Sequence, residues 1–144
     1  MSLINFGSIL GFAEEVETQN MIFFSQVSGN PDCNEYHALF ENLAKSAKKR
    51  IVEVQRAKRE NVTEMVLETI EGFHRDPFVI ASEEASVLTP QQVIEKSKEL
   101  LDRSLDYYEK AAAKLKGQAD VARALKVLAK KLLKERKKLL ELDS

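Results

Sequence analysis

Hydrophobic residues recur at alternating spacings of three and four along four stretches of the chain, which is the spacing of one face of an α-helix. They predict helices over about 4–27, 32–61, 90–116 and 119–142, the last with a near-heptad leucine stripe. The positions expected to face inward are Phe6, Leu10, Ala13, Glu17, Asn20, Phe24 and Val27; Tyr36, Phe40, Leu43, Ala47, Arg50 and Val54; Ile94, Leu101, Leu105, Tyr108, Ala112 and Leu115; and Val121, Leu125, Leu128, Leu132, Glu135, Leu139 and Leu142.

Two of these helices carry clear start signals. Asp32 is expected to be the N-cap of the second helix, with Glu35 three residues later in a capping-box arrangement. The third helix is expected to begin at Thr89 as N-cap, followed by Pro90 at the first helical position and Gln92 completing the box.

The connection between the second and third helices, about 62–89, is long. Within it, "TEMVLETIEG" predicts a short helix closed by Gly72, and the rest is expected to be irregular around Pro77. A long connection is needed when two consecutive helices run parallel, because the chain must travel the length of the bundle. The pattern therefore predicts one all-α domain over 1–144, a four-helix bundle with two tight hairpins and a long crossover between helices 2 and 3.

Composition narrows the class of protein. The chain has 144 residues, 44% hydrophobic and 31% charged, which is typical of a soluble helical domain. One cysteine, Cys33, excludes an internal disulfide and favours a reducing cytoplasm. No apolar run approaches the roughly 18 to 20 residues of a membrane span, so no membrane partner is expected.

The charge is unevenly distributed. Residues 1–112 hold 12 basic and 19 acidic side chains, a net of −7, whereas residues 113–144 hold 10 and 4, a net of +6. A basic final helix is one way to bind an anion or nucleic acid. The simpler interpretation is a solvated helix face, and the absence of aromatic residues among the lysines argues against a nucleic-acid partner.

Similar residues occur at matching places in the two halves of the chain. "FENLAKSAKKR" (40–50) lies over "LKVLAKKLLKE" (125–135), and the aromatic pair in "MIFFSQV" (21–27) lies over the pair in "LDYYEKA" (105–111). With these motifs the sequence resembles the rubrerythrin-type branch of the ferritin-like family. The resemblance implies a duplicated helical hairpin and, in the family, a di-iron centre held by four carboxylates and two imidazoles.

That resemblance assigns six ligand positions to this chain, and five of them have changed. Glu17, seven residues before Phe24, is the one expected ligand in place. The glutamate positions otherwise fall on Ala47, Leu101 and Leu132. The histidine positions fall on Arg50 and Glu135. The two histidines of the chain, His37 and His74, are expected to lie far from the bundle centre.

The charged residues left at the centre are Glu17, Arg50 and Glu135, one from each of three helices. Buried charges are costly unless they are paired and hydrogen-bonded, and a guanidinium can bridge two carboxylates. We therefore predict a buried ion-pair cluster in which Arg50 occupies the lost metal site. The alternative is that Arg50 and Glu135 extend outward to solvent and never meet.

Three functions are compatible with the sequence. The first is a non-catalytic ferritin-like protein with a degenerate di-metal site, without a cofactor, acting as a binding or interaction protein and forming a homodimer. Phe73, Phe78, Val79 and Ile80 of the connection would offer surface to a protein partner. The second is an oxidoreductase that binds iron or manganese through atypical ligands such as Glu17 and Glu135. The third is an anion or nucleic-acid binder that uses the basic final helix.

Overall fold

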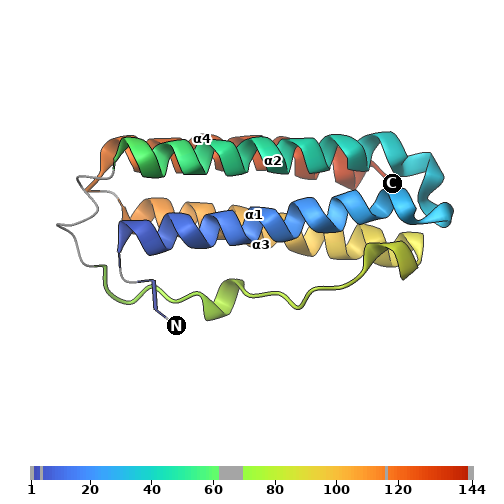
Figure 1. The fold of residues 1–144 in the computed structure, drawn as a ribbon, viewed down its shortest axis with the longest axis horizontal. Coiled ribbons are helices and arrows are strands. Elements are labelled where there is room, and N and C mark those ends of the chain that lie inside the picture. Colours follow the sequence, from blue (N-terminus) through green and yellow to red (C-terminus); the bar gives the residue numbers. More distant parts are fainter. Residues whose placement is uncertain (1, 4, 62–69, 116, 143–144) are drawn as a thin grey trace.

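Four long helices pack together in the computed structural model, which describes residues 2–3, 5–61, 70–115 and 117–142 (Figure 1). They are α1 (Phe6–Gln26), α2 (His37–Glu60), α3 (Pro90–Lys114) and α4 (Ala119–Glu141). The described residues contain no strand, and the only bridge among them joins Ser2 to His74. The all-helical prediction is confirmed. Within the described ranges, no helix combines the length and the apolar character needed to cross a membrane.

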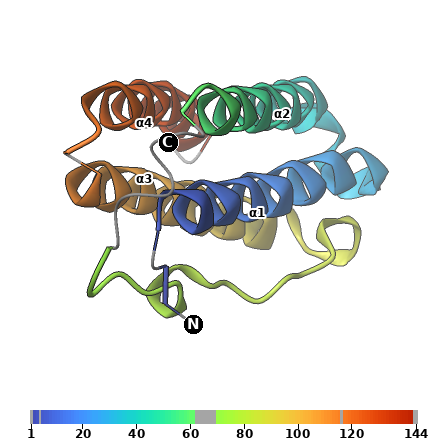
Figure 2. The same ribbon diagram turned by 60° about the vertical axis from the view of Figure 1, so that its left-hand side comes forward.

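The helices form two layers, α1 beside α3 and α2 beside α4 (Figures 1 and 2). Each hairpin, α1 with α2 and α3 with α4, is antiparallel and spans both layers, whereas α2 and α3 run in the same direction (Figure 1). Residues 70–89, here called the connecting segment, follow the outer side of the α1 and α3 layer along the bundle (Figure 2). Residues 62–69, which hold most of the predicted short helix, lie outside the described residues.

Helix starts agree with the predictions at α3 and differ at α2. Thr89 and Gln92 exchange the two bonds of a capping box, as predicted. The predicted start at Asp32 is wrong, because Pro31–Tyr36 form a 3₁₀ helix and α2 begins at His37. The N-cap of that 3₁₀ helix is Asn30, whose side chain accepts a bond from the Asp32 backbone. Asn30 also donates to the carbonyls of the connecting segment, which fixes the turn there.

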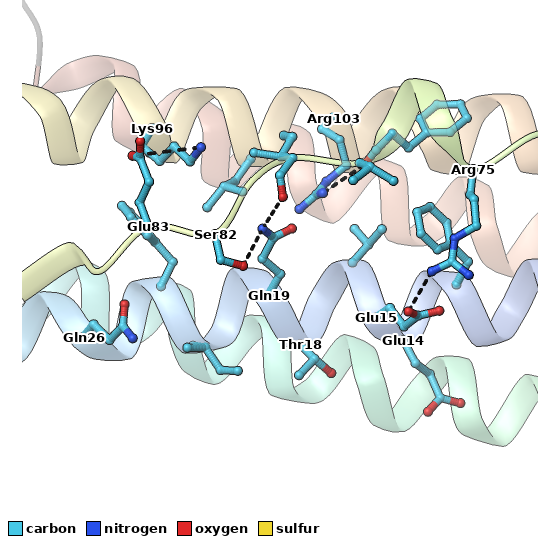
Figure 3. Close-up of a pocket in the computed structure, with 18 of the residues that line it drawn as sticks. Glu14, Glu15, Thr18, Gln19, Gln26, Arg75, Ser82, Glu83, Lys96 and Arg103 are labelled. Atoms are coloured by element: carbon cyan, nitrogen blue, oxygen red, sulfur yellow. Dashed lines mark hydrogen bonds and ion pairs between the residues drawn. The ribbon is translucent and has the colours of Figure 1, made fainter. Parts of the chain in front are cut away.

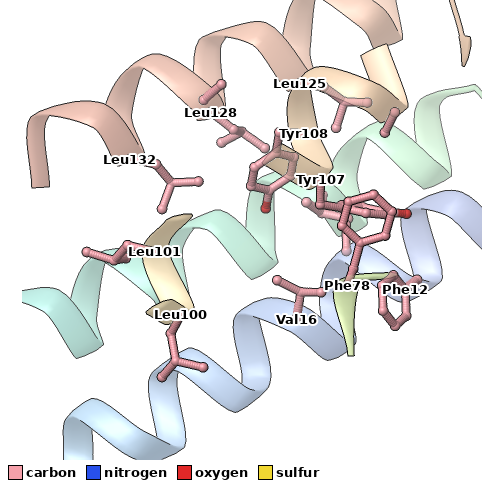
Figure 4. Close-up of a cluster of buried hydrophobic side chains, with 14 of the residues drawn as sticks. Phe12, Val16, Phe78, Leu100, Leu101, Tyr107, Tyr108, Leu125, Leu128 and Leu132 are labelled. Atoms are coloured by element: carbon pink, nitrogen blue, oxygen red, sulfur yellow. The ribbon is translucent and has the colours of Figure 1, made fainter. Parts of the chain in front are cut away.

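The inward stripes of the four helices form one core. All the predicted inward positions are buried except Tyr36, Leu105 and Leu142, which are partly exposed. Figure 4 shows part of this core, with side chains from α1, α3, α4 and the connecting segment. Tyr107 is fully buried there, and its hydroxyl donates to the Ile9 carbonyl at 2.5 Å.

The aromatic residues of the connecting segment belong to this core. Phe73 stacks on Tyr107 with ring centroids 5.7 Å apart, and Phe78 meets Tyr107 edge-on at 5.0 Å. Both phenylalanines are buried, so the expectation that they offer surface to a partner is wrong. Their burial in the core is favoured because an aromatic side chain removes a large apolar area from water. Val79, 59% exposed, remains at the surface.

Candidate functional site

The centre of the bundle holds a buried arginine between two glutamates. Arg50 of α2 is 2% exposed, and its Nε donates to Glu17 Oε2 of α1 at 2.5 Å while Nη2 donates to Glu17 Oε1 at 3.2 Å. Its Nη1 donates to Glu135 Oε2 of α4. The structure therefore brings the three charged residues together, with two parallel bonds to Glu17, the strong bidentate geometry of an arginine and a carboxylate.

Helix phase explains why these side chains meet. Each occupies the inward stripe of its helix, so folding the stripes against one another brings the polar atoms to the same level of the bundle. The predicted lost-ligand positions, Ala47, Leu101 and Leu132, are at most 1% exposed. Leu101 and Leu132 lie in the same buried cluster (Figure 4), so hydrocarbon occupies their positions.

The ion pairs extend into a longer polar network toward α3. Tyr108 donates its hydroxyl to Glu17 Oε2 at 2.7 Å, and Asn20 Nδ2 donates to Glu17 Oε1 at 3.0 Å. Asn20 also donates to Ser104 Oγ at 2.8 Å and accepts a bond from Arg103 Nη2 at 3.1 Å. Glu17 thus accepts bonds from α1, α2 and α3.

Arg103 joins this network to the connecting segment. Its Nη1 donates to the Phe78 carbonyl at 3.0 Å. Polar contacts therefore run from Glu135 on α4 across the bundle to Phe78. Sequence reasoning placed Asn20 and Tyr108 on inward faces but missed their bonds, and it missed Arg103 and Ser104 altogether. The one available signal was the position of Ser104, four residues before Tyr108 on the same side of α3.

The surroundings shift the pKa values of the network in different directions. Burial alone would lower the pKa of Arg50, but the attraction of Glu17 and then Glu135 outweighs it, so the pKa is raised. Burial raises the pKa of Glu135 more than its bond to Arg50 lowers it. This agrees with the geometry, because Glu135 Oε1 is buried and has no hydrogen-bond partner. Burial followed by the charge of Glu17 raises the pKa of Tyr108 well above its ordinary value.

These residues do not fit a pair of metal ions. Among the residues that the structure describes, no group of three or more His, Cys, Asp or Glu side chains is placed to hold a metal. Glu17 and Glu135, the ligands of the alternative metal hypothesis, share the Arg50 guanidinium. His37 pairs loosely with Glu41 at the start of α2, and His74 contacts Ser2, so neither imidazole reaches the centre. A guanidinium remains charged in proteins and repels a cation.

A groove lies on the other side of α1, between that helix and the connecting segment (Figure 3). Its volume is about 750 Å³, within the roughly 300–1,000 Å³ of small-molecule sites. Its apolar lining includes Phe12, Val16, Phe23, Phe78, Ile80 and Leu100. Gln19 lies within it and donates to the Ile80 carbonyl at 2.8 Å. This cavity, here called the α1 groove, was not predicted because it depends on how the connecting segment packs.

Comparisons with known proteins add no relative. Neither the scan against protein-family models, nor the search of curated proteins, nor that of solved structures found a match.

Proposed function

We propose that this protein is a non-catalytic bundle of the ferritin-like, rubrerythrin-type class, in which an ion-pair network has replaced a di-metal centre, and that it acts as a binding or interaction protein. The observation that carries the proposal is the Arg50 guanidinium held between Glu17 and Glu135 at the centre. Parallel α2 and α3 and the shared phase of the two hairpins support the assignment to this class (Figure 1).

The same observation argues against two-metal redox chemistry at the centre. Two cations held close together need several bridging carboxylates to neutralise them. Here two carboxylates face one permanent positive charge, and the other ligand positions carry Ala47, Leu101 and Leu132. A metal would have to displace Arg50, which would leave that guanidinium buried without its partners at a cost of several kcal/mol.

Metal analysis tests this proposal. Untagged protein is expressed in medium enriched in iron and manganese, desalted, and analysed by mass spectrometry for bound elements. We expect far less than one equivalent of either metal. The exposed pair of Lys131 and Glu53 provides a matched control through Glu53→Ala. Near-stoichiometric iron or manganese that is lost in Glu17→Ala and kept in Glu53→Ala would overturn the proposal in favour of the metal-binding oxidoreductase.

We also propose that the protein forms a homodimer and resides in the cytoplasm, where Cys33 remains a free thiol. The most exposed large apolar side chains of the described residues are Val87, Val79 and Ile22, at 78%, 59% and 49%. They belong to the connecting segment and to α1, on one side of the bundle. Light scattering after size-exclusion chromatography should give twice the monomer mass, and Val87→Lys should lower it. A monomer at all concentrations would remove the dimer from the proposal.

A second candidate function is the binding of an anionic polymer by α4. Lys126, Lys130, Lys134, Lys137 and Lys138 are all exposed along this helix. Binding of heparin that weakens steeply as salt is added would favour this candidate, because neutralised anionic sites release counterions. Such binding should then fall in a Lys130→Gln/Lys134→Gln variant.

A further inference from the structure

Arg103 is a buried cation bonded only to neutral acceptors. It is 8% exposed, and its two terminal nitrogens donate to the Phe78 carbonyl and to the Asn20 amide oxygen. Its Nε is buried and has no hydrogen-bond partner. Within the described part of the chain no carboxylate forms an ion pair with it, in contrast to Arg50, which has two. A charged group buried in this way is costly unless another group compensates it.

The electrostatic surroundings agree with this geometry. Burial lowers the pKa of Arg103 to about 10, and the attraction of Glu17 and Glu99 does not restore it. Glu17 is the stronger of these two influences, but it already accepts two bonds from Arg50 and one each from Tyr108 and Asn20. The guanidinium of Arg103 therefore still favours a further negative charge.

Arg103 lies in the wall of the α1 groove. Figure 3 shows its side chain directed from α3 toward the middle of the groove, near Gln19. The other cations of the wall already have carboxylate partners: Arg75 donates to Glu15 at 2.8 Å, and Lys96 lies 3.3 Å from Glu99. Among the described lining residues, Arg103 is thus the cation without a carboxylate partner.

The rest of the wall limits what that anion can be. The lining includes aromatic and aliphatic side chains from α1, α3 and the connecting segment. Glu14, Glu15, Glu83 and Glu84 also line the groove. Their negative charges disfavour a phosphate or a dicarboxylate, which would bring two charges or more. A single carboxylate on a hydrocarbon body matches both the one cation and the apolar wall.

We propose that the α1 groove binds a small amphipathic monocarboxylate, with its carboxylate on Arg103 and its hydrocarbon part against the groove wall. The carboxylate would accept bonds from the guanidinium, and the chain would displace water from the phenylalanines. The groove lies on the other side of α1 from the ion pairs at the bundle centre, and Arg103 is linked to them through Asn20. The proposed binding does not depend on whether that centre descends from a metal site.

Calorimetry with sodium octanoate as the probe tests the site in the full-length protein, and octanol and octylamine are the matched ligands. We expect saturable binding of octanoate with one site per chain. Octanol should bind at least about tenfold more weakly, which corresponds to about 1.4 kcal/mol, because it lacks the negative charge that strengthens the bonds to Arg103. Octylamine should not bind, because its positive charge repels the guanidinium. Equal affinities for octanoate and octanol, or no saturable binding of octanoate, would overturn the proposal.

Two variants locate the site. Arg103→Gln should weaken octanoate binding at least about tenfold, whereas Arg123→Gln, the same change at an arginine whose side chain is 73% exposed on α4, should leave it unchanged. Gly11→Phe tests the groove without disturbing the network. A Cβ built on Gly11 meets nothing within 4 Å, so the new ring can enter the groove and compete with the probe. If Arg103→Gln fails to fold, unchanged octanoate binding in Gly11→Phe would still contradict the proposal.

Discussion

The first hairpin, α1 with α2, and the second, α3 with α4, place different chemistry at positions that correspond in the predicted repeat. The first carries Glu17 and Arg50, both charged and almost fully buried. In the second hairpin, Leu101 stands at the position that corresponds to Glu17. Leu132 corresponds to Ala47, and Glu135 corresponds to Arg50. One hairpin therefore supplies most of the charge of the centre, and the other supplies most of its hydrocarbon.

The comparison shows how a bundle can combine a charged cluster with close hydrophobic packing at its centre. Hydrophobic side chains fill three of the six positions, and at the other three one guanidinium is paired with two carboxylates. A buried leucine needs no polar partner, whereas a buried charge is costly without one. The two hairpins should therefore respond differently to substitution, and the first hairpin should be the more sensitive to loss of a charge.

The largest effect is expected from Arg50→Leu. This change leaves Glu17 and Glu135 buried without their cation, and breaking a buried pair in this way costs about 3–5 kcal/mol. Denaturant unfolding at neutral pH measures the loss, with Arg123→Leu on the surface of α4 as control. The loss should shrink in acid, because Glu135, whose pKa is raised by burial, can then take up a proton. A loss below about 1 kcal/mol would instead fit an arginine that extends to solvent.

A smaller difference should separate the two glutamates. Glu17 accepts four hydrogen bonds and Arg50 holds it by two of them, so Glu17→Gln should cost about 2–3 kcal/mol. Glu135 has one oxygen without a partner and a raised pKa, so Glu135→Gln should cost about 1 kcal/mol or less. Parallel denaturant curves give both values. Equal losses would contradict the asymmetry described for the centre.

The smallest effect at neutral pH concerns the tyrosines of the second hairpin, where the first hairpin has phenylalanines. Burial raises the pKa of Tyr107 and of Tyr108, so the folded state holds their protons above the ordinary value of 10. Stability is therefore unaffected below pH 10 and falls as the pH rises above it, since only the unfolded chain ionises. Tyrosinate absorbance should show both groups titrating only on unfolding, whereas in denaturant they should titrate near 10.

Much of the fold could be predicted because it is local. The spacing of the apolar residues predicts which face of each helix is buried. The capping box of α3 involves only Thr89 and Gln92, three residues apart, so it could be predicted as well. The same spacing placed Glu17, Arg50 and Glu135 on inward faces. It does not fix whether long side chains turn inward or toward water, so only the structure shows that they meet.

The parts that were missed depend on contacts distant in sequence. Phe73 and Phe78 lie in a segment without periodicity, and their burial depends on Tyr107 about 30 residues away. Arg103 lies outside the predicted inward stripe of α3, and its bonds to Asn20 and Phe78 exist only because the connecting segment covers that side. Asp32 is not the N-cap of α2, because a 3₁₀ helix with Asn30 as its N-cap begins at Pro31 and includes Asp32.

The Arg50 bonds also restrict how the two hairpins can be aligned along the bundle axis. Leucines spaced by one turn are nearly interchangeable, so an apolar interface alone tolerates a slide of about 5.4 Å, the pitch of a helix. The same slide would separate Glu135 of the second hairpin from Arg50 of the first, which would leave the Glu135 carboxylate buried without its cation while Arg50 kept Glu17. The ion pair therefore favours one axial register of the two hairpins among the several that hydrophobic packing alone would accept.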